Sequence, residues 1–140
     1  MHLTSAEIQS ILPHREPFLL VDDADVTPGQ SVTASLYADP AWEIFRAHFP
    51  GHPILPGNYL TESMAQAADL ALLTLSEQAQ KLPVLTQVKN MRFIRPVTPG
   101  DTLKLSITVT DCGQGLYDCE GSVCIDGQRA ARGAFTIALR

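Results

Sequence analysis

Residues 58–80 read NYLTESMAQAADLALLTLSEQAQ, and this stretch decides the fold. It contains no Gly or Pro and is rich in Ala, Leu and Met, which favour helix. Most of its apolar residues form one stripe at helical spacing, but Ala65, Leu70 and Leu73 lie off that stripe. The sequence therefore predicts one long helix, from Asn58 to about Gln80, that is apolar almost all round and surrounded by protein.

The segments on both sides of this helix alternate between apolar and polar residues, which is typical of half-buried strands. After the helix, strands are predicted over 84–95, 103–109, 117–125 and 129–139, the last two joined by the hairpin turn Asp126-Gly127. Before it, a buried strand is predicted over 18–21, and the turn at 27–30 leads into a strand over 31–36. No βαβ alternation is present, so we expect an α+β fold in which an antiparallel sheet wraps around the helix.

Two other segments carry clear local signals. Thr4-Ser5-Ala6-Glu7 has the form of a capping box and predicts a short helix that ends near Pro13. The segment from Asp39 to Gly57 contains four Pro and two Gly, which predicts a rigid, irregular loop.

Composition excludes several classes of protein. A length of 140 residues suits one domain spanning 1–140, and 10 Lys and Arg against 15 Asp and Glu give a net charge of −5, which argues against nucleic-acid binding. The most apolar stretch, 65–75, is too short and too interrupted to cross a membrane. Three cysteines without CxxC spacing and an N-terminus without the pattern of a secretory signal favour the cytoplasm.

Three residues between the loop and the helix suggest acid–base chemistry. His48, held by a proline-stiffened loop, is a side chain suited to act as a base near neutral pH. Gly57 stands where the helix begins, so its N–H has no helical partner and is available to an oxyanion. Glu62 lies just over one turn into the helix, where desolvation favours the protonated form of a carboxyl group, and Gln66 lies one turn further on the same face.

Each of these residues also has a purely structural interpretation. His48 alone in a loop is more often hydrogen-bonded than catalytic, and Glu62 could be a paired or solvated helix carboxylate that Gln66 orients. His2, His14 and His52 carry no signal of function. The sequence has no nucleophile elbow, phosphate loop or dinucleotide fingerprint, so covalent catalysis and nucleotide binding have little support.

Four blocks follow one another along the chain. They are LPHREPFLLVD at 12–22, HFPGHPILPG at 48–57, ESMAQA at 62–67 and RFIRPVTPGD at 92–101. Together they resemble the FabZ-type 3-hydroxyacyl-acyl-carrier-protein dehydratases of type II fatty-acid synthesis, and the resemblance runs nearly end to end.

The resemblance implies a hotdog fold, a dimer with two shared active sites and, in many members, a trimer of dimers. His48 of one chain would face Glu62 of the other. The implied reaction removes water from a (3R)-3-hydroxyacyl thioester of acyl carrier protein and gives the trans-2-enoyl thioester, without a metal or organic cofactor. His48 would take the C2 proton, the Gly57 amide would polarise the carbonyl, and Glu62 would protonate the leaving hydroxyl.

The resemblance also implies residues for binding. The acyl chain would contact residues near the site, namely Phe49, Leu55, Asn58, Tyr59 and Gln66, in a tunnel that Leu60 and Met64 also line. The acidic carrier protein would dock on a basic patch formed by Lys89, Arg92, Arg95 and Lys104, whose alternative interpretation is ordinary solvated strand charge.

Several residues depart from the family pattern. Ala47 replaces the usual Gly before the catalytic His, Asn58-Tyr59 replaces an apolar pair, and Glu16 and Asp23 replace a usual Tyr and Arg. These departures bear on acyl-chain length and carrier docking. Three other functions stay open: a dehydratase/isomerase, a hotdog thioesterase, and a non-catalytic acyl-thioester-binding module. The dehydratase/isomerases form a sibling family that has Asp at the position of Glu62.

Overall fold

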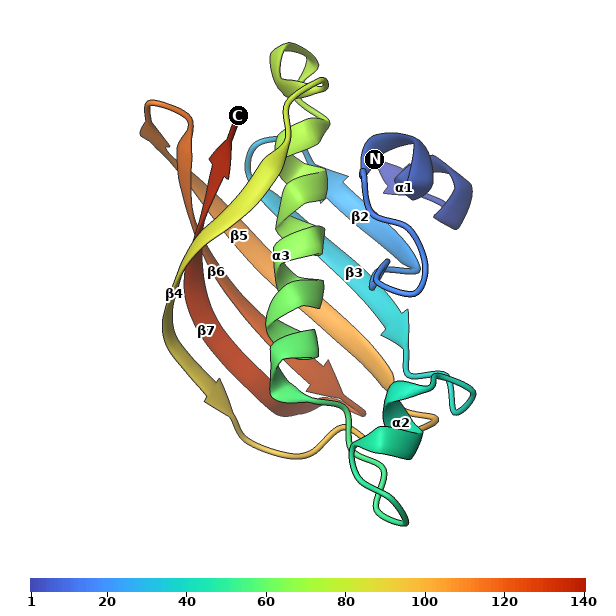
Figure 1. Cartoon of the computed structure of the whole chain (residues 1–140). Coiled ribbons are helices and arrows are strands. Elements are labelled where there is room, and N and C mark those ends of the chain that lie inside the picture. Colours follow the sequence, from blue (N-terminus) through green and yellow to red (C-terminus); the bar gives the residue numbers. More distant parts are fainter.

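A seven-stranded antiparallel sheet curves around one long helix, α3 (Gly57–Leu73) (Figure 1). The computed structural model describes all residues, 1–140. The strands lie side by side in the order β1 (His2–Leu3), β2 (Asp23–Thr27), β3 (Ser31–Tyr37), β5 (Thr102–Gly113), β6 (Leu116–Ile125), β7 (Gln128–Leu139) and β4 (Pro83–Phe93). The remaining elements are α1 (Ser5–Ile11), α2 (Ile44–Ala47) and a short 3₁₀ helix (Ser76–Gln78). This is the α+β arrangement expected from the sequence.

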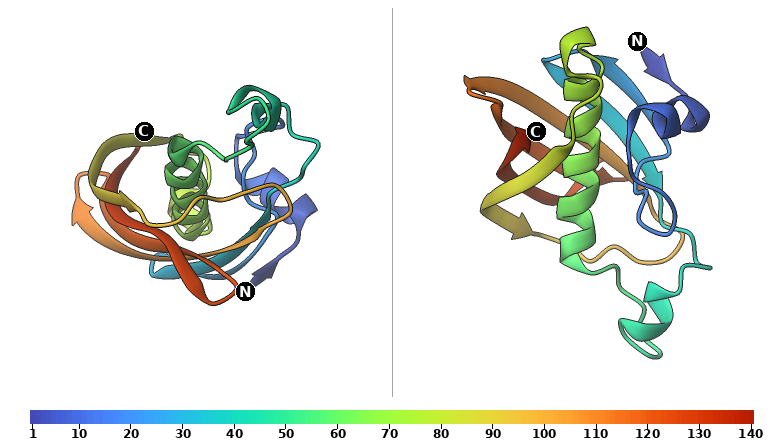
Figure 2. Two further views of the ribbon diagram at one scale, coloured as in Figure 1. Left: turned by 90° about the horizontal axis from the view of Figure 1, so that it is seen from below. Right: turned by 45° about the horizontal axis from the view of Figure 1, so that its top comes forward.

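The helix α3 lies inside the curve of the sheet (Figure 2). Every residue from Ser63 to Leu73 is buried, so the prediction of a helix surrounded by protein is confirmed. The sheet covers one side of α3, and α1 also contacts it. None of the helices combines the length and the hydropathy that crossing a membrane requires.

A pair of glycines lets the sheet bend closely around the helix. Gly121 of β6 lies opposite Gly133 of β7. A Cβ on Gly121 would lie 3.2 Å from the sulfur of Met64 in α3, and a Cβ on Gly133 would lie 2.9 Å from the Cα of Met91 in β4. Any side chain at these two positions would therefore push the helix or β4 away from the sheet.

The strand β4 forms one edge of the sheet. It pairs only with β7, and its register with β7 is interrupted twice. Leu85, Val88 and Phe93 of β4, with Ile94 directly after it, are large apolar side chains that are exposed in the isolated chain. An edge strand with exposed apolar side chains can pair with a strand of another chain.

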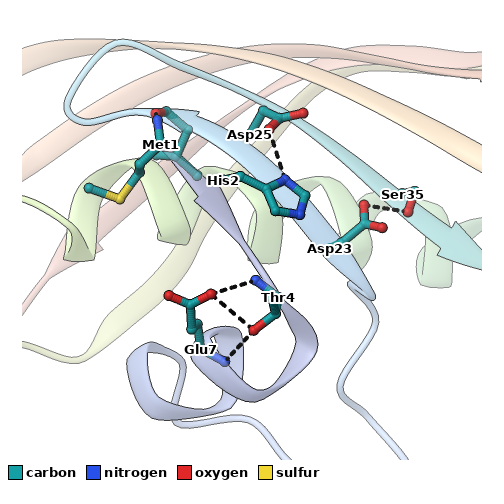
Figure 3. A network of polar contacts seen from close by, with 8 residues as sticks. Met1, His2, Thr4, Glu7, Asp23, Asp25 and Ser35 are labelled. Atoms are coloured by element: carbon teal, nitrogen blue, oxygen red, sulfur yellow. Dashed lines mark hydrogen bonds and ion pairs between the residues drawn. The ribbon is translucent and has the colours of Figure 1, made fainter.

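The N-terminal segment is held to the other edge by polar contacts (Figure 3). The predicted capping box is present, because the side chain of Thr4 accepts a hydrogen bond from the Glu7 N–H and Glu7 accepts one from the Thr4 N–H. Nδ1 of His2 lies 2.9 Å from the carboxylate of Asp25 in β2. The predicted short helix is confirmed and ends at Ile11, before Pro13.

The predicted turns at 27–30 and at 126–127 are confirmed, but two other expectations are wrong in part. Residues 18–21 form no strand, because the Leu20 N–H donates to the side chain of Gln66 and not to a neighbouring strand. The loop from Asp39 to Gly57 contains the short helix α2. β5, β6 and β7 are neighbours in the order of the chain, whereas β4 lies on the far side of β7.

The long helix also ends earlier than predicted, at Leu73 rather than near Gln80. The hydroxyl of Thr74 donates to the carbonyl of Leu70 at 2.7 Å. Leu75 then adopts an extended conformation, and its side chain lies against Gly29 in the turn between β2 and β3. This contact draws the chain away from the helix axis.

One buried carboxyl group stands out within α3. The side chain of Asp69 is only 4% exposed, and its Oδ1 has no hydrogen-bond partner. Burial raises the pKa of Asp69 well above its ordinary value, and the nearby charge of Glu62 adds to the rise. Burial therefore favours the protonated form of Asp69 in the folded protein.

The replacement Asp69→Asn should remove part of the pH dependence of stability. The folded state keeps a proton on Asp69 that the unfolded chain releases above a pH of about 4. The free energy of unfolding of the wild type therefore falls as the pH rises from about 4 toward the raised pKa, and Asn abolishes this contribution. Urea unfolding of both proteins between pH 4 and pH 8 measures it, and equal pH slopes would show that Asp69 is ionised in the fold.

Candidate active site

His48 lies directly after α2, and hydrogen bonds fix it at both its backbone and its ring. The His48 N–H donates to the carbonyl of Ile44 at 2.9 Å, and Nδ1 lies 2.8 Å from the carbonyl oxygen of Ile54. Because a carbonyl oxygen can only accept, Nδ1 carries the proton. In the neutral ring, Nε2 is then unprotonated and able to accept a proton.

Gly57 and His48 line one cavity of about 260 Å³. Gly57 is the first residue of α3, as predicted, so no carbonyl within the helix can accept from its N–H. The ring of Phe93 packs against Gly57 so closely that a Cβ there would lie 3.0 Å from the ring carbons. The other walls are mainly apolar and include Leu55, Leu60 and Val97.

Glu62 lies in the second turn of α3, and its side chain is 21% exposed. Its Oε2 accepts a hydrogen bond of 2.8 Å from Nε2 of Gln66. Gln66 is fully buried, and its amide group also donates to the carbonyl of Phe18 and accepts from the Leu20 N–H. Gln66 therefore contacts Glu62, as its place one turn further along the helix suggested, and at the same time ties the segment before β2 to the helix.

This network distinguishes the two oxygens of Glu62. Oε2 accepts from Gln66 and also lies 3.6 Å from Nε2 of His14. A proton on the carboxyl group therefore belongs on Oε1, which has no hydrogen-bond partner within the chain. Oε1 is thus the atom able to donate a proton to a bound molecule.

His14 is a site residue that the reasoning from single residues missed. It is half-buried beside Glu62, and burial lowers its pKa while the charge of Glu62 opposes that shift. Its Nδ1 is buried without a hydrogen-bond partner, so a neutral ring with its proton on Nε2, toward Glu62, fits the surroundings. The available signal was its place in the block at 12–22, one of the four blocks that carry the family resemblance.

One chain does not bring His48 and Glu62 together. The cavity at His48 includes Gly57 but not Glu62. Glu62 follows Gly57 by five positions, which places the two residues about 140° apart around the axis of α3. Glu62 faces His14 and the 18–20 segment, whereas the His48 cavity lies against the residues that follow β4.

The predicted acyl-contacting residues lie in different surroundings. Leu55 is buried in the wall of the His48 cavity, but Phe49 is 51% exposed and Asn58 is exposed. Tyr59 packs its ring edge-on against Phe18, at 5.8 Å between centroids. Met64 is fully buried against Gly121 and does not line the cavity.

Three of the residues that depart from the family pattern meet in a second, larger hollow. Glu16, Ala47 and Tyr59 all line this space of about 1040 Å³. The acidic side chains of its wall outnumber the single basic one, Arg46. Asp23 lies elsewhere, on β2, where it accepts a hydrogen bond from Ser35.

Only some of the residues of the predicted basic patch form a cluster of free positive charge. Lys89 pairs with Asp118 at 3.4 Å, which satisfies its charge. Arg92 lies opposite Arg132 of β7, and Lys104 of β5 and Arg129 of β7 lie on the two sides of β6, since both are opposite Cys124. We call the resulting group the basic corner, and it comprises Arg92, Arg95, Lys104, Arg129 and Arg132.

Arg95 connects the basic corner to the candidate site, because it also lines the His48 cavity. Sequence reasoning missed Arg129 and Arg132, since only the pairing of β6, β7 and β4 brings them beside Arg92. No group of three or more His, Cys, Asp or Glu side chains could hold a metal ion, and all three cysteines are free.

The fold and the site together indicate the class of protein to which this chain is similar. The curved antiparallel sheet around one long helix is the hotdog fold expected above. The candidate site adds His48, in the loop before this helix, and Glu62, in its second turn. Among solved structures, the dehydratase heterocomplex ApeI:P from Xenorhabdus doucetiae is similar, with a TM-score of 0.76, 19% identity, and coverage of 95% of this chain and 90% of that chain. A hypothetical thioesterase with coenzyme A from Streptococcus pneumoniae matches with a TM-score of 0.64 and 13% identity, covering 84% of each chain.

Sequence similarity narrows the class to a family. Residues 12–134 match the family described as the FabA-like domain, and the chain belongs to this family. A 3-hydroxyacyl-[acyl-carrier-protein] dehydratase FabZ from Acetivibrio thermocellus is 39% identical, with coverage of 98% of this chain and 94% of the relative. The protein of the same name from Enterococcus faecalis is 38% identical, with coverage of 99% of both chains. The expected resemblance to FabZ-type dehydratases is therefore confirmed.

Proposed function

We propose that this chain removes water from (3R)-3-hydroxyacyl thioesters of acyl carrier protein and forms trans-2-enoyl thioesters. Its FabZ relatives carry the name of this reaction and match nearly the whole chain. The observation that carries the proposal is the cavity that Gly57 and His48 line together, with Nδ1 of His48 held by the carbonyl of Ile54.

Each group has one task in the proposed mechanism. The Gly57 N–H donates to the thioester carbonyl and stabilises the negative charge that forms when the C2–H bond breaks. Nε2 of His48 takes that C2 proton. The C3–O bond breaks as Oε1 of Glu62 gives its proton to the leaving hydroxyl, which departs as water. Transfer of a proton from the His48 imidazolium to the Glu62 carboxylate through solvent restores the starting state.

The partner chain supplies the missing half of each site in this proposal. Because Glu62 does not line the His48 cavity of its own chain, a site with both residues needs a second chain that places its His48 beside this Glu62. The exposed apolar side chains of the edge strand β4 support a two-fold dimer in which two β4 strands pair and continue the sheet. Association of three such dimers into a hexamer is a further step of the same proposal.

The reaction itself is tested by hydration of crotonyl thioester, carried by acyl carrier protein, followed at the ultraviolet absorbance of the enoyl group. We expect the absorbance to fall and the product to be the 3-hydroxyacyl thioester. A free acid as product would indicate a thioesterase, and a cis-3-enoyl product would indicate an isomerase. Binding without turnover would indicate a binding module and would contradict the proposal.

The acidic carrier protein is proposed to dock on the basic corner, with Arg95 leading toward the cavity. The double variant Arg129→Gln/Arg132→Gln should raise KM for carrier-bound substrate about tenfold and leave KM for a short thioester of N-acetylcysteamine unchanged, because only the carrier presents negative charge. Added salt should have the same selective effect on the wild type. Lys89→Gln is the matched control, since Lys89 is already paired with Asp118. An equal effect on both substrates would rule out docking at this corner.

The place of action is proposed to be the cytoplasm. The three free cysteines suit a reducing compartment, and Cys119 is buried where oxidation would gain it no partner.

A further inference from the structure

His14 is held beside Glu62 by contacts that do not involve Glu62 itself. It follows Leu12, the buried residue at the end of α1, and Pro13 stiffens the link between them. The guanidinium group of Arg15 donates to the carbonyl oxygens of Leu12, at 2.9 Å, and of His14, at 2.6 Å, which fixes the backbone on both sides of Pro13. The position of the imidazole is therefore set by the backbone around it.

Gln66 ties the same segment to the helix that carries Glu62. Its side-chain amide donates to the carbonyl of Phe18 at 2.8 Å and accepts from the Leu20 N–H at 2.7 Å. The same amide donates to Oε2 of Glu62 at 2.8 Å. Nε2 of His14 lies 3.6 Å from that same oxygen. Oε2 therefore has two nitrogen donors close to it, whereas Oε1 has no partner within the chain.

The surroundings of His14 favour a neutral ring. Its Nδ1 is buried without an acceptor, so a proton on that atom would lack a partner. Burial lowers the pKa of His14, and the charge of Glu62, which opposes this shift, is the smaller effect. A neutral imidazole with its proton on Nε2 can donate to Glu62 without adding a positive charge. A full positive charge in that place would hold the carboxyl group ionised and unable to give a proton.

Few other charged groups surround Glu62. His14 is the only basic side chain of the chain that forms an ion-pair contact with it. Asp69, two turns further along α3, is buried, and burial favours its neutral form. In the proposed dimer, His48 of the second chain adds one more imidazole to this site. The behaviour of the Glu62 carboxyl group therefore depends strongly on its contact with His14.

We propose that His14 is a positioning residue whose Nε2–H stabilises the Glu62 carboxylate that forms when Oε1 gives its proton to the leaving hydroxyl. The inference rests on the proposed dehydratase function and adds a residue to it. The distance of 3.6 Å is longer than the usual hydrogen bond of about 2.7–3.2 Å, and the negative charge that develops on the carboxylate draws the two atoms together. The proton of Nε2 stays on His14 throughout.

This contact acts on the rate because it strengthens during the reaction. A hydrogen bond to a carboxylate is stronger than one to a neutral carboxyl group, so His14 stabilises the transition state more than the bound substrate. Gln66 donates to the same oxygen and adds to the effect. A site with His14 can thus keep a proton on Glu62 and still release it readily.

Three variants at position 14 separate this role from packing. Phenylalanine keeps a planar ring without a donor, glutamine places an N–H near the position of Nε2, and lysine adds a permanent positive charge. The measurement is the pH dependence of kcat for dehydration of carrier-bound 3-hydroxybutyryl thioester, whose alkaline limb reports loss of the acid's proton. In His14→Phe, we expect this limb to move up by about one pH unit and kcat to fall about tenfold. His14→Gln should keep the limb in place and kcat within threefold, and His14→Lys should move the limb to lower pH.

A second measurement does not depend on turnover. The carboxyl carbon of Glu62 is titrated by NMR in protein labelled with ¹³C at the glutamate carboxyl groups, and its signal is assigned by its absence in Glu62→Gln. The midpoint should be highest in His14→Phe, unchanged in His14→Gln and lowest in His14→Lys. His2→Ala is the matched control, because His2 is an exposed imidazole that contacts Asp25 on β2, and it should change neither measurement.

The outcomes separate this inference from the proposed function. If folded His14→Phe loses activity while the alkaline limb and the carbon midpoint stay in place, His14 acts only through packing, so the inference is overturned and the function stands. Failure of folded His14→Gln to restore the wild-type limb would also overturn the inference. If the wild type turns over no thioester, the function is overturned and the role of His14 in it falls as well. Thermal unfolding of each variant checks that the fold is retained.

Discussion

The variants Glu62→Gln and His48→Ala should each lower kcat/KM by more than a hundredfold while the fold is retained. Glutamine keeps the size of Glu62 but has no acidic proton to give to the leaving hydroxyl. Alanine at position 48 removes the only imidazole among the residues that line the cavity beside Gly57. Acid and base groups of this kind contribute roughly 10² to 10⁴ to rate. The measurement is the hydration of crotonyl thioester by each purified variant.

A control histidine is available in the same loop. His52 is exposed, and its backbone pairs with that of Phe49, so His52→Ala changes the loop without touching the cavity. We expect near wild-type activity for His52→Ala. Near wild-type activity in folded His48→Ala or Glu62→Gln would remove that residue from the mechanism.

The second large effect is recovery of activity when the two inactive variants are combined. A mixed dimer of one His48→Ala chain and one Glu62→Gln chain has one site with both defects and one site with neither. By the two-fold symmetry it should show up to about half of the wild-type activity, a gain of well over tenfold over either parent. The recovery is expected because Glu62 does not line the His48 cavity of its own chain.

This experiment uses two affinity tags, so that only dimers with one chain of each kind are purified and assayed. The matched control is a dimer of two differently tagged chains that both carry His48→Ala. This dimer should stay inactive. If the mixed dimer of the two different variants is as inactive as its parents, His48 and Glu62 act from the same chain. The proposed shared site would then be wrong.

Local sequence determined the elements of this protein wherever neighbours along the chain supply the stabilising contacts. The capping box at Thr4 and Glu7, the turn at Asp126-Gly127, and the period-two pattern of β5 all appear in the structure as predicted. The helix α3 was also evident, because its apolar character all round requires protein on every side. The order of the four sequence blocks was sufficient to indicate the family and the residues His48, Gly57 and Glu62.

Contacts between distant segments decided the rest, and no local pattern encodes them. Gln66 holds residues 18–20 out of the sheet, and Leu75 ends the helix by packing on Gly29. The pairing of β7 with both β6 and β4 gathers the arginines of the basic corner. His14 is brought to within 3.6 Å of Glu62 across 48 residues of chain, and Oδ1 of Asp69 is buried without a hydrogen-bond partner. Propensity and periodicity act within a few residues, so the sequence by itself determined which segments are helix or strand, whereas the tertiary structure decided which polar groups meet and which do not.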